Sequence, residues 1–309
     1  MSHSQDRIRL DSGCSDGGHS LPKGSDASRL RIAWLTDLHL DHVDMASWYA
    51  LIERIAATQA THLVVTGDIS EGDDVPFQLQ RLATDTALPI WFVLGNHDFY
   101  QGSIARQREA IRSLCDADER LGFLTTSLPV WITNSVALIG EDGWGDGVVG
   151  DYDNSFVRLN DFLRIHDFRE VPKTRWKRKL RQLGQESAAR LQQKLASVVD
   201  SARHVVVATH VPPFSEACWY EGKTADANWA PFFVCGGVGD RLREFAIKHP
   251  TIQVTVLCGH SHHPGVAQIR DNLVVYTGEA IYGRPSLAGL LTMDVNGVQC
   301  KPWDERLQA

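Results

Sequence analysis

Five short groups of polar residues constrain the fold of this chain more than any other feature. Each group directly follows an apolar run that predicts a strand: Asp37-Leu38-His39, Gly67-Asp68, Gly95-Asn96-His97-Asp98, Thr209-His210 and Gly259-His260-Ser261-His262. Because residues at the carboxyl ends of parallel strands meet at one edge of a sheet, we expect the five groups to converge. The series therefore predicts one site built from residues that lie far apart in the sequence.

Strand-like and helix-like patterns alternate along the first 120 residues. We expect strands over 31–36, 62–66 and 89–94, and helices over 45–60, 75–86 and 103–117. This order predicts parallel strands joined by crossover helices. Further along, the patterns predict two strands within 130–141, a helix over 185–201, strands over 204–208 and 252–257, and antiparallel strands between 265 and 303. The whole series is typical of an α/β protein with two packed sheets flanked by helices.

The composition of two segments sets them apart from the rest. Residues 1–29 are rich in Ser, Gly, Asp and His and hold few large apolar residues, so we expect a disordered leader. Residues 142–184 are glycine-rich, then acidic, then basic, and are interpreted as an insertion. No internal repeat or clear linker is present. One domain over 30–309 is therefore expected, with the insertion at about 142–184.

Charge and cysteine content exclude several classes of protein. The net charge of −7 argues against a general nucleic-acid-binding protein, because such proteins neutralise phosphates with excess Lys and Arg. The six cysteines form no C-x-x-C pair and do not resemble a disulfide framework, which favours a reducing compartment. No apolar run approaches the roughly 18–20 residues that span a bilayer. A cytoplasmic protein without a membrane segment is expected.

The five groups together offer the ligands that two adjacent divalent metals need. Asp68 is the natural bridging carboxylate, because a neutral imidazole rarely bridges two ions. Asp37 and His39 are two residues apart and face the same way in an extended segment, as do His260 and His262. The remaining candidate ligands are the amide oxygen of Asn96 and the imidazole of His210. We expect Mn²⁺ or Fe, with Zn²⁺ as an alternative, and a mixture of imidazole, carboxylate and amide ligands does not choose among these metals.

Each group taken alone has a simpler interpretation. A single histidine after a strand is more often a surface or hydrogen-bonded residue, and a Gly-Asp pair is usually a turn. The simpler interpretation would have to hold independently at five strand ends that all carry metal-type ligands. One shared site that holds two metals explains the series better.

In order and spacing, the series D-L-H, G-D, G-N-H-D, T-H and G-H-S-H resembles the calcineurin-like metallophosphoesterase superfamily, over roughly residues 31–277. The resemblance implies a four-layer α/β/β/α sandwich with two mixed sheets and a dinuclear site at the strand ends. It assigns Asp37, His39, Asp68 and His262 to the first metal, and Asp68, Asn96, His210 and His260 to the second. His97 is implied to face the substrate as the catalytic residue.

Two positions depart from well-known branches of this superfamily. Glu71 stands where purple acid phosphatases have a tyrosine, so a ferric–tyrosinate centre is not expected. The Ser/Thr protein phosphatases have Asp and then Arg where this chain has Glu71 and Gly72, so their phosphate-binding arginine is missing. The chain therefore resembles the bacterial-type group of small phosphodiesterases and phosphatases.

The expected activity is metal-dependent hydrolysis of a small-molecule or nucleotide phosphate ester. A hydroxide that bridges the metals would attack phosphorus, with His97 as acid or charge stabiliser at the leaving oxygen. Glu71 or Asp98 could orient His97, although a solvated or capping carboxylate is the simpler interpretation of each. Two alternatives stay open: a DNA or RNA nuclease of the same superfamily, and a non-catalytic binding scaffold.

Two further segments bear on the substrate. Residues 211–233 carry several aromatic rings that could stack a base or cover a hydrophobic leaving group, although capping of the core is the simpler interpretation. The basic run 173–181 could contact nucleic acid or an anionic surface, although one exposed helix face is simpler. The expected partner is thus a phosphate ester, with a nucleotide as one candidate. Nucleic acid is not favoured, and the oligomeric state is left open.

Overall fold

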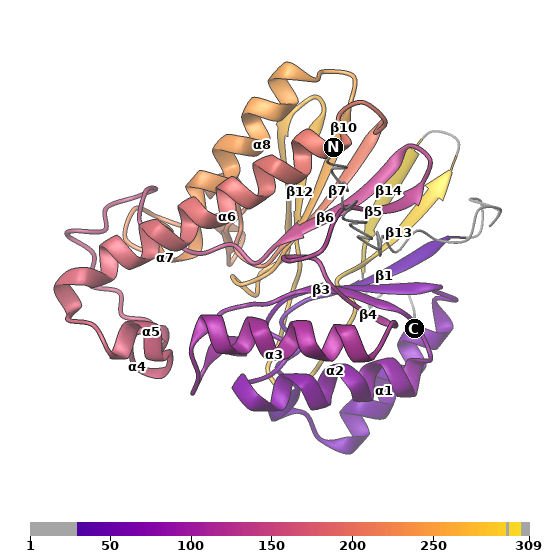
Figure 1. The fold of residues 1–309 in the computed structure, drawn as a ribbon, viewed down its shortest axis with the longest axis horizontal. Helices are drawn as coiled ribbons and strands as arrows, with labels where there is room; N and C mark the ends of the chain where they lie inside the picture. The colour runs from indigo at the N-terminus through magenta and orange to yellow at the C-terminus, as the bar shows by residue number, and fades with distance from the viewer. Residues whose placement is uncertain (1–29, 295–296, 304–309) are drawn as a thin grey trace, which may run out of the picture.

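The structure, a computed structural model, describes residues 30–294 and 297–303 (Figure 1). The segment predicted as a disordered leader, 1–29, lies outside the described residues. Two six-stranded sheets pack against each other in the middle of the molecule, and helices cover their outer faces (Figure 1). Within 30–294 and 297–303, no helix has both the length and the apolar character needed to cross a membrane.

The first sheet has the strand order β14-β13-β1-β2-β3-β4. Its strands are β1 (Arg31–Leu35), β2 (His62–Thr66), β3 (Ile90–Val93), β4 (Leu121–Phe123), β13 (Gly289–Asp294) and β14 (Gly297–Pro302). Strands β1 to β4 run parallel, whereas β13 is antiparallel to both β1 and β14. The sheet is therefore mixed.

The second sheet has the order β11-β12-β10-β7-β6-β5. Its strands are β5 (Val130–Thr133), β6 (Val136–Glu141), β7 (His204–Thr209), β10 (Gln253–Cys258), β11 (Gly265–Arg270) and β12 (Leu273–Thr277). The four inner strands are parallel, and the edge strands β5 and β11 are antiparallel to their neighbours. Both sheets thus have parallel strands at the centre and antiparallel strands at an edge.

Helices α1 (Met45–Ala57), α2 (Val75–Thr86) and α3 (Ile104–Ala117) cover the first sheet (Figure 1). Helices α6 (Trp176–Val198) and α8 (Gly236–Lys248) cover the second. The period of two along β1 shows the layering, because Ala33 and Leu35 pack with the helices while Ile32 and Trp34 pack between the sheets. The predicted four-layer α/β/β/α sandwich is confirmed.

Short elements connect these layers and carry much of the cleft described below. The helical ones are α4 (Asp161–Arg164), α5 (His166–Arg169) and α7 (Ala230–Phe233). The 3-10 turns are η2 (Leu40–His42), η3 (Gly72–Asp74), η4 (His97–Phe99), η5 (Lys173–Arg175) and η6 (Ser215–Ala217). A small hairpin is formed by β8 (Trp219–Tyr220) and β9 (Lys223–Thr224).

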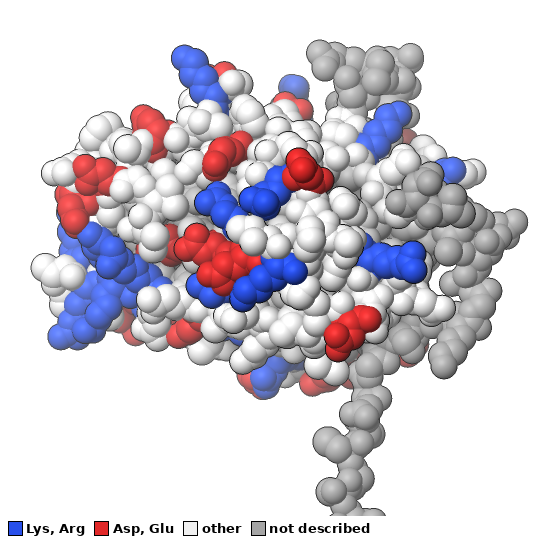
Figure 2. Space-filling view, turned by 90° about the horizontal axis from the view of Figure 1, so that it is seen from above, with Lys and Arg blue, Asp and Glu red and all other residues white. Residues whose placement is uncertain are grey.

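The basic run 173–181 belongs to η5 and the start of α6. The predicted start of this helix at 185 was therefore wrong, since the helix begins at Trp176, inside the segment interpreted as an insertion. Leu180 is buried while Arg178 and Arg181 are exposed, so the run is one exposed helix face, the simpler of its two interpretations. Figure 2 shows Lys and Arg side chains gathered at the end of the molecule where Figure 1 places this helix start.

Two further sequence expectations need correction. Strand β12 was expected to be antiparallel, but it pairs in parallel with β10 and is antiparallel only to β11. Apolar alternation reports which face of a strand is buried and carries no information on its direction. Helix α8 was not predicted, because its first four residues include three glycines. The prediction of one domain over 30–309 with an insertion at about 142–184 stays a prediction.

Candidate metal centre

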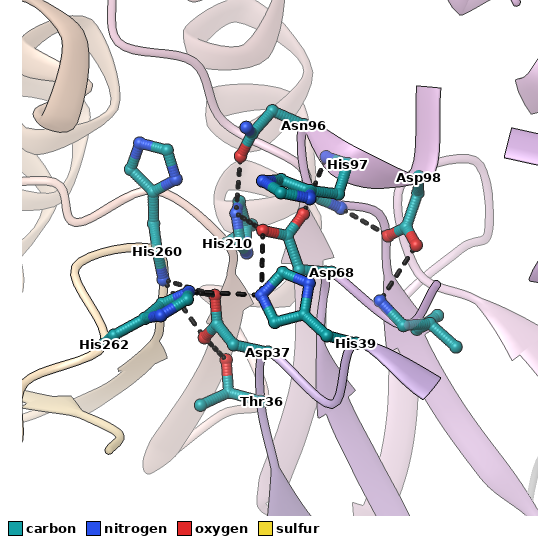
Figure 3. A network of polar contacts seen from close by, with 12 residues as sticks. Thr36, Asp37, His39, Asp68, Asn96, His97, Asp98, His210, His260 and His262 are labelled. Carbon is teal, nitrogen blue, oxygen red and sulfur yellow. Dashed lines mark hydrogen bonds and ion pairs between the residues drawn. The ribbon is translucent and has the colours of Figure 1, made fainter. Parts of the chain in front are cut away.

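All seven predicted ligands lie together at the carboxyl ends of five parallel strands (Figure 3). Asp37 and His39 follow β1, Asp68 follows β2, and Asn96 follows β3 in the first sheet. In the second sheet His210 follows β7, and His260 and His262 follow β10. We call these seven residues the cleft floor. These residues lie close together, as the sequence analysis expected of the five groups. Their roles as metal ligands stay a prediction.

The backbone bends sharply at five positions of the cleft floor. Asp37, His39, Asp68, His260 and His262 all have positive φ, between 42° and 67°. This left-handed conformation costs an L-residue roughly 1–2 kcal/mol, and such strain collects at functional sites. Here it turns the side chains inward as each chain segment leaves its strand.

The glycines before Asp68 and Asn96 allow the two sheets to approach at this point. A Cβ atom at Gly95 would lie 2.1 Å from Oδ1 of Asp68 and 2.7 Å from Cε1 of His210. A Cβ atom at Gly67 would lie 2.7 Å from Nδ1 of His210. The glycine of each Gly-Asp or Gly-Asn pair is therefore required by close packing around the polar residues, not only by a turn.

Asp37, His39, Asp68 and His262 form a first donor group, with one ligand atom from each within 4.8 Å of the others. The Nε2 atoms of His39 and His262 are 3.2 Å apart, and Nε2 of His262 lies 3.4 Å from Oδ1 of Asp37. Two imidazole nitrogens facing each other beside two carboxylates suit a divalent cation, which accepts a lone pair from each. The donor chemistry of this group fits a metal ion.

A second donor group consists of Asp68, His210 and His260, again within 4.8 Å of one another. Nε2 of His210 lies 3.4 Å from Oδ2 of Asp68 and 3.1 Å from Oδ1 of Asn96. Asp68 belongs to both groups, as its predicted bridging role requires. A second divalent ion therefore fits these residues as well.

Backbone carbonyls hold two of the floor imidazoles in place. Nδ1 of His210 is 2.9 Å from the carbonyl oxygen of Thr66, and Nε2 of His260 is 3.2 Å from that of Phe232. A hydrogen bond to one ring nitrogen leaves the other as the lone-pair donor and fixes the orientation of the ring. Both rings are thus set to present a single nitrogen to the second donor group.

The electrostatics of the cleft floor favour ionised carboxylates. Burial alone would raise the pKa of Asp37, but the hydrogen bond from His262 and the charges of His210 and His262 lower it to about 2. Burial also opposes ionisation of Asp68, yet the charges of His210 and His97 hold its pKa well below the usual value. Asp37 and Asp68 are therefore held in the ionised form, which is the form of a carboxylate that binds a cation.

Two of the floor histidines stay neutral. Burial lowers the pKa of His39 to about 4, although Asp68 and Asp37 oppose this, and burial with the charge of His210 lowers the pKa of His260 to about 3. Neutral imidazole is the form that binds metals, so both rings are available as ligands near neutral pH.

His97 lies beside the two donor groups and belongs to neither. Its backbone N–H donates to Oδ1 of Asp68 at 2.8 Å, and its ring packs against those of His39 and Tyr100 at centroid distances of 4.7 and 4.4 Å. The ring lines the cleft, and its Nδ1 is buried without a hydrogen bond, 4.0 Å from Oε1 of Glu71. This place is compatible with its predicted substrate-facing role.

The two carboxylates next to His97 are held by other partners. Asp98 accepts the backbone N–H groups of Ile69, Ser70 and Gly95 at 2.7–3.1 Å, so it is a capping carboxylate. Glu71 is bound by both terminal nitrogens of Arg164 at 2.5 Å. The simpler interpretation therefore holds for Asp98, whereas Glu71 stays near His97 under the control of an arginine from α4.

Sequence reasoning missed several residues at this site. Asp161 and Arg164 come from α4, inside the segment interpreted as an insertion. Tyr100 donates its hydroxyl to Asp161 at 2.8 Å, and Tyr282 stacks on His39 with a centroid distance of 4.3 Å. Asp161, Arg164 and Tyr282 belong to no motif and follow no central strand, so no signal in the sequence marked them. Tyr100 was not missed, because its place two residues after Asp98 made it a sequence candidate for contact with the substrate.

A cleft of about 870 Å³ opens above the cleft floor. It is lined on one side by floor residues and His97, and on the other by the hairpin β8–β9, α7 and the segment before α4. Its volume exceeds that needed for a phosphate group alone and is typical of sites for small organic ligands.

Comparison with known proteins agrees with this architecture. A model of the calcineurin-like phosphoesterase family matches residues 30–264. A search of curated proteins found no match.

Three solved structures share the fold. The phosphopantetheinyl hydrolase from Mycobacterium tuberculosis is 16% identical, with 84% of this chain and 92% of that chain covered and a TM-score of 0.61. A dimetal phosphatase from Danio rerio is 11% identical, with 90% and 100% covered and a TM-score of 0.56. The protein TT1561 from Thermus thermophilus is 11% identical, with 88% and 98% covered and a TM-score of 0.51. At these identities the likeness concerns the fold alone.

Proposed function

We propose, from the premise that this chain belongs to the calcineurin-like phosphoesterase family, that it hydrolyses a small-molecule or nucleotide phosphate ester. Membership of the family makes the protein a dinuclear, metal-dependent phosphoric ester hydrolase. The finer parts of the proposal are the class of ester, the ligand set and the role of His97.

The observation that carries the proposal is the pair of donor groups that share Asp68 beneath the cleft. Asp37, His39, Asp68 and His262 would hold one ion, and Asp68, Asn96, His210 and His260 the other. When bound, two such ions polarise a phosphoryl group, activate water and neutralise developing charge. Mn²⁺ or Fe is proposed, with Zn²⁺ as the alternative, because imidazole, carboxylate and amide oxygen suit all three.

The chain's own residues would supply orientation and a proton. The Asp68 carboxylate receives the backbone N–H of His97, which couples the position of that ring to the bridging residue. Nε2 is the nitrogen available for the leaving oxygen, because Nδ1 faces Glu71. His97 would donate a proton there or stabilise negative charge.

The charge of the cleft favours a small ester over a nucleic-acid strand. Among the described residues that line it, Lys223 is the sole Lys or Arg. A strand of nucleic acid carries one charge per nucleotide and needs several cations along its path. A nuclease therefore stays the second candidate.

Metal content and turnover, measured on the same preparation, test the proposal. The purified protein is stripped with a chelator, reloaded with Mn²⁺, Fe²⁺ or Zn²⁺, and assayed for bound metal by mass spectrometry. Hydrolysis is then measured for bis-p-nitrophenyl phosphate, p-nitrophenyl phosphate, cyclic nucleotides, nucleotide diesters and single-stranded DNA. We expect two ions per chain and turnover of a small ester. Two bound ions without turnover of any substrate would favour the non-catalytic scaffold.

A further inference from the structure

The part of the cleft beyond the floor is lined by aromatic rings. Trp219 and Tyr220 come from the hairpin strand β8, Trp229 and Phe233 from the α7 segment, and Tyr282 from the loop before β13. We call these five residues the aromatic wall. They come from three separate parts of the chain, so only the tertiary fold brings them to one surface.

Three rings of the aromatic wall are left open to solvent. Tyr220 is 61% exposed, Trp229 is 46% exposed and Tyr282 is 47% exposed. Other rings of segment 211–233 behave differently, since Phe214 and Phe232 are buried in the cores. The expectation that the rings of segment 211–233 cap the core is thus correct for Phe214 and Phe232 and wrong for Tyr220 and Trp229. Large apolar groups gathered on an exposed concave surface are typical of a ligand site.

Ring contacts connect the aromatic wall to the cleft floor. Trp229 packs edge-on against Phe233 with a centroid distance of 5.6 Å, and Phe233 packs against His260 at 4.5 Å. On the opposite side Tyr282 stacks on His39. An ester bound at the floor would therefore extend one of its substituents along these rings.

Hydrogen bonds hold the backbone on the Trp229 side of the wall in place. Oδ1 of Asp226 accepts the N–H groups of Asn228 and Trp229 at 2.9 and 3.0 Å. The neighbouring Ala227 accepts the N–H of Asp151 at 2.7 Å, which ties this loop to the segment 142–184. Such a surface binds a rigid ring with little cost in conformational entropy.

We propose that Trp229, Phe233 and Tyr220 form a subsite for a planar aromatic substituent of the phosphate ester, which rests on the proposed function. The ring could be a nucleobase or another aryl group, since both present an uncharged π-face. A second phosphate group is a poor occupant, because Lys223 is the sole Lys or Arg among the described lining residues.

Two diesters with the same leaving group isolate the subsite. Bis-p-nitrophenyl phosphate and methyl p-nitrophenyl phosphate both release p-nitrophenolate, but only the first retains a second aryl group. We expect Trp229→Ala to lower kcat/KM for the aryl diester about tenfold, as loss of one stacking contact implies, and to leave the methyl diester unchanged. Trp229→Phe keeps an aromatic ring and should therefore retain most of the wild-type kcat/KM for the aryl diester. Tyr49→Ala, an exposed ring on α1, is the matched control and should change neither substrate.

A nucleoside 5′-p-nitrophenyl phosphate distinguishes the two sources of the ring. A larger effect of Trp229→Ala on this substrate than on the aryl diester identifies a nucleobase subsite, and a smaller effect identifies an aryl subsite. Equal losses on the aryl and methyl diesters, or no loss on either, would overturn the proposal.

Binding measured without turnover separates this inference from the proposed function. Calorimetry of the metal-loaded protein compares phenylphosphonate with methylphosphonate. We expect phenylphosphonate to bind about tenfold more tightly, and Trp229→Ala to remove that advantage. A chain that hydrolyses nothing but keeps this preference would contradict the proposed function alone. Equal affinity for the two phosphonates would contradict the subsite.

A second inference rests on a separate observation, the contact of Asp161 with Asn96. Oδ1 of Asp161 accepts the amide N–H of Asn96 at 2.9 Å, while Oδ1 of Asn96 faces His210 at 3.1 Å. The same Asp161 oxygen accepts the Tyr100 hydroxyl. Because an acceptor oxygen can only face the NH₂ end of an amide, Asp161 determines which way the Asn96 amide points.

We infer that Asp161 is a positioning residue for the second metal, because it aims the Asn96 oxygen at the second donor group. Outer partners of metal ligands typically contribute 10–100-fold to affinity. Asp161→Asn retains an acceptor oxygen and should behave like the wild type. Asp161→Ala should weaken binding of one of the two ions by about tenfold or more, measured by metal titration.

Three variants separate positioning from a general structural role. Asp146→Ala removes another buried carboxylate of the same segment, one that accepts backbone N–H groups of Val148 and Gly237 and touches no floor residue. It should lower thermal stability without changing metal stoichiometry. Tyr100→Phe removes only the second donor to Asp161 and should retain both ions. If Asp161→Ala does not fold, Asp161→Leu replaces it, since leucine fills the space without an acceptor oxygen. Wild-type affinity for both ions in a folded Ala or Leu variant would overturn the inference.

Discussion

The cleft floor and the aromatic wall face the same cleft and are built on opposite principles. Floor residues lie one to four positions after central strands, and all except His262 are buried. Wall residues lie on a hairpin, a short helix and a loop, and several rings are half exposed. The floor is therefore fixed by the ends of central strands, whereas the wall is carried by short elements and a loop at the surface.

Hydrogen bonding shows the same contrast. Asp37 accepts the backbone N–H of His260 through both carboxylate oxygens at 3.0 and 3.1 Å, which links β1 to β10 and so links the two sheets. Rings of the wall contact one another and the floor histidines through their faces and edges, as Phe233 does with Trp229 and His260 and Tyr282 does with His39. Removal of a floor residue should therefore disturb the whole site, and removal of a wall ring should disturb one substituent of the substrate.

The largest expected effect follows from Asp68→Asn. This change removes a charge from both donor groups, so we expect loss of bound metal and a fall in kcat/KM of about 10³-fold, as loss of several kcal/mol of charge stabilisation implies. Metal analysis and steady-state kinetics on one preparation provide the measurement. Retention of two ions per chain by the variant would contradict the bridging assignment.

A pair of glycine variants tests whether atoms are packed more closely around the floor than around the wall. A Cβ at Gly95 would lie 2.1 Å from Asp68, so Gly95→Ala should displace that carboxylate and lower kcat/KM by about 10²-fold. Gly222, in the hairpin turn, has φ of 76° and no atom within 4 Å of an added Cβ. Gly222→Ala should cost only about 1 kcal/mol of backbone strain. Metal content and kcat/KM are measured for both variants. Equal losses in the two variants would show that the floor is no more sensitive to an added methyl group than the wall.

The next effect concerns His97, at the border between floor and wall. If this ring protonates the leaving oxygen, His97→Asn should lower kcat by about 10²-fold for an alkyl phosphate ester. The same variant should change turnover of a p-nitrophenyl ester far less, because p-nitrophenolate leaves without protonation. The ratio of the two losses is the readout. Unchanged turnover of the alkyl ester would exclude the acid role.

The last effect concerns stability and not turnover, at His204, which begins the strand β7 that leads to the floor residue His210. Burial lowers the pKa of His204 to about 4. A depressed folded-state pKa means that His204 favours folding above pH 6.5, and that this contribution is lost as the pH falls towards 4. The difference between the ordinary pKa of 6.5 and the folded-state pKa of about 4 corresponds to a loss of up to about 3 kcal/mol of unfolding free energy.

Urea unfolding of the wild type and of His204→Gln at about pH 7.5 and about pH 4.5 measures this contribution. His204 accepts from or donates to Thr255 at 2.8 Å, a contact that glutamine can imitate without titrating in this range. We expect the wild type to lose more unfolding free energy than the variant over this range. Parallel losses in the two proteins would show that His204 does not contribute to the pH dependence.

Much of the fold and of the cleft floor could be predicted because the relevant information is local. A strand, its polar end and a glycine beside it are neighbours in the sequence, as in His62–Thr66 followed by Gly67 and Asp68. The Asp-x-His spacing of Asp37 and His39 was interpreted as an extended segment, which was wrong, because both residues have positive φ and reach the floor through bends in the backbone. Helix α2, over Val75–Thr86, was also predicted to the residue, since its apolar positions recur at helical spacing.

Other features depend on how distant segments pack. The start of α6 could not be found from its basic first turns, because its burial depends on Leu180 meeting the core of the first sheet. The direction of β12 is set by its parallel pairing with β10, and the pairing of Asp161 with Asn96 spans 65 positions.

The sequence by itself therefore determined which polar residues follow the central strands, and with them the family, because a strand and its polar end are neighbours in the chain. Only the packing of the two sheets brought those residues into one cleft floor, and only the tertiary structure decided which residues support and surround it. Asp161, Arg164 and Tyr282 reach the site by contacts between segments far apart in the chain, and such contacts leave no periodic trace in the residues that make them.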